Sequence, residues 1–187
     1  MPRAGLDHTA VVDLALSVVD DGGATGYADL TLATVAARAG VAVPSLYKHV
    51  DGLPGLRRDV ALVCVREFAA LTCDLDTVAE MGHAMRDYAL AAPGRYDAIQ
   101  GTSWVHDPAA WEVQEAGAAV IADLSRGVEA LGVPPESCIH AVRAVRAAVH
   151  GFIVLELGGG FGMPEDVDVS FAFLVDGLVD GLTRLRV

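Results

Sequence analysis

The sequence is poor in the features that mark secreted, membrane-spanning or zinc-binding proteins. It has three cysteines in 187 residues and no CxxC pair, so neither a disulfide framework nor a zinc site is expected. Its longest apolar stretch, Val149–Leu157, contains Glu156 and falls far short of the roughly 20 residues that span a bilayer. Met1–Gly5 shows no secretory signal pattern. We therefore expect a reduced, cytoplasmic protein without a membrane partner.

Motifs of the common enzyme classes are also missing. The chain has no HExxH, GxSxG or P-loop motif and no GxGxxG opening a helix. The six histidines and the His106-Asp107 pair keep a helical metal-dependent hydrolase as the main enzyme alternative. A helical scaffold that binds protein rather than DNA is the other alternative. We expect no catalytic residue, no bound metal and no cofactor.

Strand-period runs with hairpin signals do not occur, and helical spacing of apolar residues dominates. Apolar residues make up 53% of the chain, enough for a packed core. Gly and Pro clusters separate the periodic segments. The sequence thus predicts an all-α fold with short helices first and long ones after, at about 7–20, 32–39, 44–50, 54–71, 76–92, 97–103, 108–131, 134–157 and 166–186.

The charge is divided unevenly along the chain. The net charge is −12, which argues against a surface that coats nucleic acid as a whole. Residues 1–58 hold five bases and six acids, whereas residues 59–187 hold eight bases and nineteen acids. Between residues 31 and 58 a single acid, Asp51, opposes four bases. A locally positive face on an acidic body can attract phosphate there and discourage binding elsewhere.

The stretch Leu30–Val50 has the spacing of a helix-turn-helix unit. Two short helices that cross at a wide angle need a small residue at the crossing, and Ala36 supplies it. Four positions later Gly40 supplies a turn residue that tolerates a positive φ. Three apolar residues then fill the wedge between the helices: Val35, Val41 and Leu46. An ordinary αα-hairpin with the same small residues is the alternative.

The outward residues of the second short helix favour DNA binding. Hydroxyl, ammonium and imidazole donors, which suit phosphate oxygens, stand together at Tyr47, Lys48 and His49. The N-terminus of such a helix meets base edges in the major groove. Our DNA-binding candidates are Thr31, which is placed to cap the first short helix, and Val43, Pro44, Ser45, Tyr47, Lys48 and His49.

The run GVAVPSLYKHV, preceded by Thr31 and Ala36 and followed by a long helix, resembles the DNA-binding domain of the TetR/AcrR family over roughly residues 8–58. Its PSLYKHV segment is similar to the P-T-L-Y-x-H-V of the tetracycline repressor branch. The resemblance implies a homodimeric repressor that binds a palindromic double-stranded DNA operator and releases it when a small molecule enters the C-terminal domain. It implies a DNA-binding domain at 1–52 and a ligand-binding and dimerisation domain at 53–187.

The resemblance also assigns roles and shows two departures. Val43 and Pro44 would face bases, with Ser45, Tyr47 and His49 on the DNA backbone and Lys48 reaching either. Family members often carry a polar residue near the start of the first short helix, where this chain has Leu32 and Ala33, and a phosphate-binding lysine where it has Leu53. We expect Arg57 and Arg58 to compensate, with fewer polar base contacts and more reliance on DNA shape.

The last two long helices carry more apolar surface than one core requires. A seam of Cys138, Val142, Val145, Val149 and Phe152 runs along residues 134–157. The helix at about 166–186 has a leucine-rich face and Gly177 and Gly181 four residues apart. We predict a homodimer through these two helices. Complete burial within one subunit is the alternative.

Aromatic and methionine side chains are the candidates for an effector pocket, because such a cavity is apolar with few polar anchors. At helical spacing they can equally be ordinary core. The ligand-binding candidates are Met81, Met85, Tyr88, Trp104, Trp111, His150 and Phe152.

Overall fold

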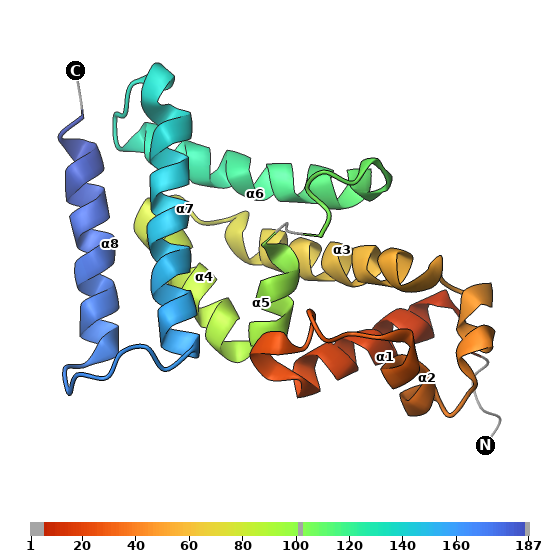
Figure 1. The fold of residues 1–187 in the computed structure, drawn as a ribbon. Coiled ribbons are helices and arrows are strands. Elements are labelled where there is room, and N and C mark those ends of the chain that lie inside the picture. The colour runs from red at the N-terminus through yellow and green to blue at the C-terminus, as the bar shows by residue number, and fades with distance from the viewer. Residues whose placement is uncertain (1–5, 101–102, 186–187) are drawn as a thin grey trace. The chain divides into compact units, whose positions relative to one another are not determined.

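The computed structural model describes residues 6–100 and 103–185, and every regular element in those ranges is a helix. The α-helices are α1 (His8–Asp21), α2 (Leu32–Ala39), α3 (Gly52–Thr72), α4 (Val78–Ala91), α5 (Pro93–Ile99), α6 (Trp111–Ala130), α7 (Pro135–Leu157) and α8 (Val167–Thr183) (Figure 1). Three short 3-10 helices complete the set: η1 (Gly23–Thr25), η2 (Val43–Lys48) and η3 (Pro108–Ala110). The predicted all-α fold is confirmed.

The prediction of a helix at 97–103 is wrong in the described part of that range, and residues 101–102 lie outside the described residues. In its place α5 (Pro93–Ile99) begins two residues after α4 ends, so Pro93-Gly94 forms a first turn rather than a separator. Proline is tolerated there because its missing N–H has no partner in a first turn. Gly94 lets α5 approach α1: a Cβ at this position would lie 2.7 Å from the carbonyl oxygens of Val19 and Gly23. This close approach between distant segments cannot be seen in the local sequence.

The second short helix is a 3-10 helix, Val43–Lys48, rather than the predicted α-helix at 44–50. The backbone N–H of Ser45 donates to the carbonyl of Ala42 at 2.9 Å, and that of His49 to the carbonyl of Leu46 at 2.8 Å. Pro44 has no N–H to donate, and six residues are too few for a regular α-helix to gain much from its own hydrogen bonds. Tertiary packing therefore holds this element.

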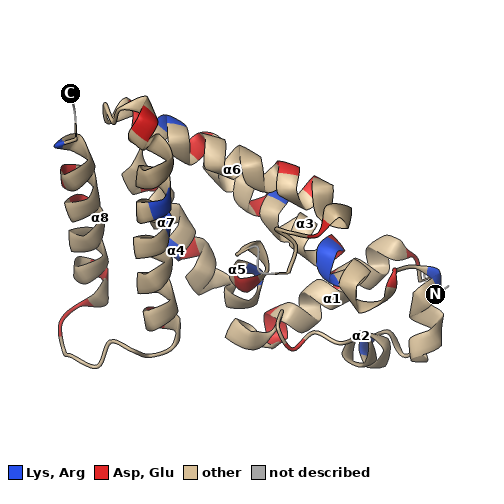
Figure 2. Cartoon of the chain, turned by 45° about the horizontal axis from the view of Figure 1, so that its top comes forward, with Lys and Arg blue, Asp and Glu red and all other residues tan. Residues whose placement is uncertain are grey.

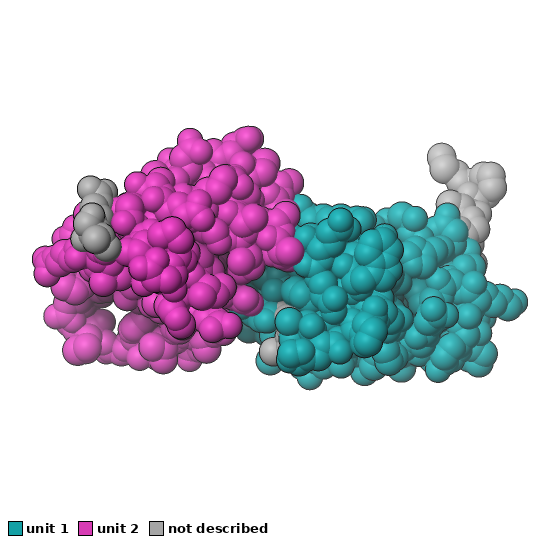
Figure 3. Space-filling view, turned by 90° about the horizontal axis from the view of Figure 1, so that it is seen from above, with its two compact units in different colours: residues 1–67, 92–116 teal, residues 68–91, 117–187 magenta. Residues whose placement is uncertain are grey.

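The chain forms two compact units, coloured separately in Figure 3: residues 1–67 with 92–116 (unit 1), and residues 68–91 with 117–187 (unit 2). In unit 1, α1, α2, η2 and the first half of α3 enclose an apolar core whose members include Val11, Val35, Leu46 and Val60, all at 0% exposure. The predicted boundary between residues 52 and 53 falls within this unit, at the start of α3. As a division by function, it remains a prediction.

In unit 2, α7 packs against α4 and α8. Val142, Val145 and Val149, which form most of the apolar seam seen in the sequence, are buried inside this unit with Phe171 of α8. The seam therefore serves the core of the unit, and the homodimer through these two helices stays a prediction. By length and composition alone α7 is apolar enough to cross a bilayer, with a mean hydropathy of 1.5 over a window that is 33% buried.

Substitution of Gly94 tests the packing of α5 on α1. We expect Gly94→Ala to lower the free energy of unfolding by about 1–3 kcal/mol, because the added methyl group meets backbone oxygens that have no room to move. Denaturant unfolding of the full chain measures the change. Gly162→Ala is the matched control, since a Cβ there meets nothing within 4 Å. Equal stability of the two variants would contradict the close approach.

Candidate nucleic-acid interface

The start of α2 is fixed by a reciprocal pair of threonines. The Thr31 hydroxyl accepts from the backbone N–H of Thr34 at 3.1 Å, and the Thr34 hydroxyl oxygen accepts from the N–H of Thr31 at 3.3 Å. This is a capping box in which threonine replaces the usual Glu or Gln. The predicted cap at Thr31 is confirmed, and it orients α2 from its first residue.

The turn between α2 and η2 depends on Gly40. Its φ of 68° lies in the left-handed region, which glycine enters without the steric cost that a Cβ brings. The N–H of Val41 donates to the carbonyl of Ala36 at 3.0 Å and closes the end of α2. Ala36 itself is buried at the crossing, as its small size predicted. The helix-turn-helix geometry expected from the sequence is therefore present.

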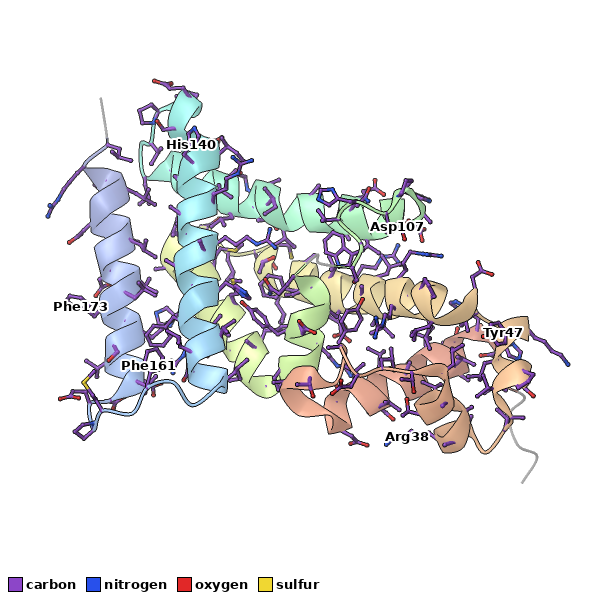
Figure 4. The ribbon with its side chains drawn as sticks, viewed as in Figure 1. Arg38, Tyr47, Asp107, His140, Phe161 and Phe173 are labelled. Carbon is purple, nitrogen blue, oxygen red and sulfur yellow. The ribbon has the colours of Figure 1, made fainter. Side chains whose placement is uncertain are left out.

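One buried side chain anchors η2. Leu46 has 0% exposure within the core of unit 1, and Val50 just beyond the element is buried as well. On the opposite side Pro44 and Lys48 are exposed, and Tyr47 is 60% exposed. Figure 4 labels Tyr47 on η2, beside the first turn of α3. Because Leu46 cannot leave the core, the residues around it are held facing solvent.

The structure brings some of the predicted DNA-binding residues together at one place. Tyr47, Lys48 and His49 line an open hollow of about 230 Å³. Thr31, Val43, Pro44 and Ser45 lie outside it, with Thr31 and Pro44 exposed and Val43 and Ser45 half-buried. The rest of the lining consists of His8, Val50, Asp51, Gly55, Arg58 and Asp59. We call this surface the η2 hollow.

Most of the basic side chains near the hollow are already engaged. Arg57 donates from Nη2 to the carbonyl oxygens of Ala28 and Leu30, at 2.7 and 3.3 Å. Its guanidinium thus holds the segment that leads into α2, and its role at a phosphate stays a prediction. Arg58 lines the hollow and pairs through Nη1 with Asp107 at 3.2 Å.

Arg38 on α2 is likewise engaged, since it donates to Ser17 and Asp21 of α1. Figure 2 shows the wider charge distribution, with acidic positions spread over α6 and α8. Attraction for phosphate beside η2 therefore depends on the few side chains that line the η2 hollow.

Two contacts that the sequence did not reveal attach α5 and the segment after it to the helices of unit 1. Arg95 on α5 donates from Nε to Asp20 and from Nη1 to Glu67, both at 2.7 Å. These carboxylates raise the pKa of Arg95 above its ordinary value. Partners 75 and 28 residues away along the chain leave no periodic signal by which they could be found.

Tyr27 provides the second of these contacts. Its hydroxyl lies 2.7 Å from the Ser103 hydroxyl and donates to the carbonyl of Arg57 at 3.1 Å. Burial raises the pKa of Tyr27 above its ordinary value, which keeps the phenol in its donating form further into alkaline pH.

The effector-pocket candidates fall in both units. In unit 2 Met81 is buried, Met85, Tyr88 and His150 are half-buried, and the half-buried ring of Phe152 lies 4.6 Å from Phe161 and 5.1 Å from Phe171. In unit 1 Trp104 is buried and donates to the carbonyl of Ala98 at 2.9 Å, whereas Trp111 is 61% exposed. Which of them line a pocket stays a prediction.

An ion-pair network in unit 2 also escaped the sequence analysis. Arg86 is 7% exposed and donates to both carboxylate oxygens of Glu156 and to Asp168 at 2.6 Å. Its guanidinium lies 4.9 Å from the ring centroid of Phe171. Hydrogen bonds to Glu156 raise the pKa of Arg86. The network ties α4 to the end of α7 and the start of α8.

Unit 2 leaves apolar side chains uncovered on its last two helices. We use the name α7/α8 face for the large apolar side chains of these two helices that are at least half exposed: Phe173 at 81%, Val169 at 67%, Leu155 at 52% and Val154 at 51%. Figure 4 shows Phe173 on the side of α8 turned away from α7. A Cβ added at Gly151, Gly177 or Gly181 would meet nothing within 4 Å. Within the described residues, nothing occupies the space above these glycines.

In residues 6–100 and 103–185 no group of three or more His, Cys, Asp or Glu side chains is placed to hold a metal ion.

The anchored short helix η2, the left-handed turn at Gly40 and the exposed polar side chains of η2 define a helix-turn-helix DNA-binding protein.

Comparison with known proteins identifies the family. Residues 78–178 match the family described as "Tetracyclin repressor-like, C-terminal domain". The chain is 31% identical to the uncharacterized HTH-type transcriptional regulator YobS of Bacillus subtilis, over 97% of this chain and 95% of YobS. It is 32% identical to the uncharacterized HTH-type transcriptional regulator Rv0681 of Mycobacterium tuberculosis, over 97% and 84% of the two chains.

Among solved structures, Mycobacterium smegmatis BioQ is similar to this chain. The two are 27% identical, with a TM-score of 0.68 and coverage of 96% of this chain and 99% of BioQ. BioQ has also been solved with its natural double-stranded DNA operator. The chain belongs to the TetR family of transcriptional regulators, as the sequence motif indicated. The hydrolase and scaffold alternatives have no support among these relatives.

Replacement of Thr31 tests the cap of α2. We expect Thr31→Ala to lower the free energy of unfolding by about 0.5–2 kcal/mol, because an N–H of the first turn loses its acceptor. Thr31→Ser keeps the hydroxyl and should retain most of the stability. Denaturant unfolding measures both variants, and equal losses would show that the hydroxyl does not cap the helix.

Proposed function

We propose that the protein is a homodimeric, cytoplasmic repressor that binds a palindromic operator through η2 and releases it when a small molecule binds the C-terminal domain. The observation that carries the proposal is the anchoring of η2, with Leu46 at 0% exposure and its neighbour Tyr47 at 60%. A helix held in this way presents a fixed set of side chains to the major groove.

The roles of the exposed residues follow from their chemistry and position. Val43 and Pro44, at the N-terminal end of η2, face bases, and Pro44 suits a thymine methyl group. Ser45, Tyr47 and His49 hold the DNA backbone, and Lys48 neutralises a phosphate or reaches a base edge. Thr31 lies at the exposed start of α2, and the N-terminus of a helix favours a phosphate.

The α7/α8 face supports the dimer. Exposure of its four large apolar side chains to water costs free energy, because each is half or more exposed. Contact with the same face of a second copy would bury these side chains. Gly151, Gly177 and Gly181 leave room for close approach of a partner helix. A dimer holds two η2 helices about 34–36 Å apart, so that both enter successive major grooves on one side of the DNA.

Release by a small molecule requires that the ligand bind one arrangement of the dimer better than another. The match of residues 78–178 to a tetracycline-repressor-like C-terminal domain supports such an effector. A coupling free energy of about 1–3 kcal/mol would weaken operator affinity roughly 5- to 150-fold. The candidates for contact with the effector are the aromatic and methionine side chains Met81, Met85, Tyr88, Trp104, Trp111, His150 and Phe152.

Two substitutions on η2 test DNA binding. Lys48→Gln should weaken operator binding and reduce the slope of log affinity against log salt by about one, because it removes a cation that neutralises a phosphate. Tyr47→Phe removes one hydroxyl and should weaken binding severalfold, the equivalent of about 0.5–1.5 kcal/mol. Electrophoretic shift with the promoter beside its own gene, over a salt series, measures both.

Arg66→Gln is the charge-matched control for Lys48→Gln, because Arg66 is exposed on α3 and lies outside the η2 hollow. An equal loss of affinity in this control would show that net charge, and not the position of Lys48, governs binding.

Phe173→Glu tests the dimer. A charge at the most exposed apolar residue of the α7/α8 face should raise the dimer dissociation constant about thirtyfold or more, the effect of a hot spot worth about 2 kcal/mol. Sedimentation velocity over a concentration series measures the change. Leu71→Glu, at a residue that is 54% exposed on α3, is the control. A dimer that survives Phe173→Glu unchanged would rule this face out.

A further inference from the structure

The η2 hollow contains two imidazoles from distant parts of the chain. His8 enters it from α1, and His49 follows η2 directly. The Nε2 atom of His8 lies 2.9 Å from Oδ2 of Asp59 on α3. The structure therefore brings His8 to the same surface as Tyr47 and Lys48, although 39 and 40 positions separate them in the sequence.

The fixed charges around the hollow cancel. Lys48 and Arg58 are its cations, Asp51 and Asp59 are its carboxylates, and Arg58 is additionally paired with Asp107. Tyr47 contributes a neutral hydroxyl. With both imidazoles neutral the hollow has no net attraction for an anion, and with both protonated it gains two positive charges. The protonation of His8 and His49 thus decides whether the hollow carries a net positive charge.

We propose that the η2 hollow receives a phosphate of the DNA backbone and that operator binding takes up protons on His8 and His49. This inference rests on the proposed function and adds a regulation to it: the operator is held more tightly at pH 6 than at pH 8. The occupant is a phosphodiester because the hollow adjoins the DNA-reading residues and offers hydroxyl, ammonium and imidazole donors without a closed apolar wall.

The direction follows from linkage. Imidazole is the side chain whose ordinary titration falls between pH 5 and 8. A phosphodiester nearby favours the charged form, so the complex binds more protons than the free protein does. Affinity therefore rises as pH falls through this range. The other charged groups that line the hollow with the imidazoles are Lys48, Arg58, Asp51 and Asp59.

The experiment measures operator affinity at pH 6, 7 and 8 at one ionic strength, with the dimeric full chain and a duplex selected from random sequence by the same protein. We expect about tenfold tighter binding at pH 6 than at pH 8, which corresponds to about 1.4 kcal/mol. His8→Gln and His49→Gln should each reduce this ratio, and the double variant should abolish it. His140→Gln, at an exposed histidine of unit 2, should leave it unchanged.

A second measurement separates proton uptake from a structural effect of the His8–Asp59 pair. Titration calorimetry of the duplex into the wild-type protein, in buffers of different ionisation enthalpy, should show net proton uptake at pH 7, and the double variant should show none. Uptake that persists in the double variant would overturn the inference, as would equal affinity of the wild-type protein at pH 6 and pH 8. Absence of specific binding at every pH would instead contradict the proposed function.

Discussion

The proposed DNA-reading surface depends on one constraint, the burial of Leu46 within a helix of only six residues. A helix this short has little stability of its own, so its position is set by the side chain it commits to the core. The left-handed turn at Gly40 and the threonine cap of α2 bring η2 to the place where Leu46 can be buried. Once Leu46 is buried, the side chains of Tyr47 and Lys48 must face solvent.

An acidic protein that binds DNA must keep its positive charge local. The chain does so by engaging most arginines of unit 1 internally: Arg38 with α1, Arg57 with backbone carbonyls, Arg58 with Asp107 and Arg95 with two carboxylates. These pairs stabilise the unit and also remove cations from competition for phosphate. Lys48 is left to supply attraction beside η2, where two histidines share the η2 hollow with it. Such an arrangement favours a specific site over nonspecific binding to DNA.

Local features of the fold could be predicted from the sequence because they are decided by neighbouring residues. The cap at Thr31, the turn at Gly40 and the burial of Val35 and Leu46 each depend on residue type and short spacing, and all are present. The motif also led to the correct family. Element boundaries differ from the prediction where a tertiary contact decides them, as at Pro93-Gly94, where close packing on α1 starts α5 earlier than the pattern indicated.

The parts that could not be predicted join residues far apart in the chain. His8 and Asp59 are 51 positions apart, and Arg86 and Glu156 are 70 apart. The valine seam of α7 is a further case in which the packing partner could not be predicted. Periodicity showed that Val142, Val145 and Val149 share a face, but it could not show whether α8 or a second subunit covers that face. Only the packed structure separates the internal seam from the exposed α7/α8 face.

Selection of duplexes from a random pool by the purified protein tests the central claim most directly. An η2 helix that is held rigidly and presented twice by a symmetric dimer should enrich an inverted repeat, with half-site centres one helical turn or a multiple of it apart. A pool that remains random after repeated rounds, or that enriches a single unpaired half-site, would contradict the account.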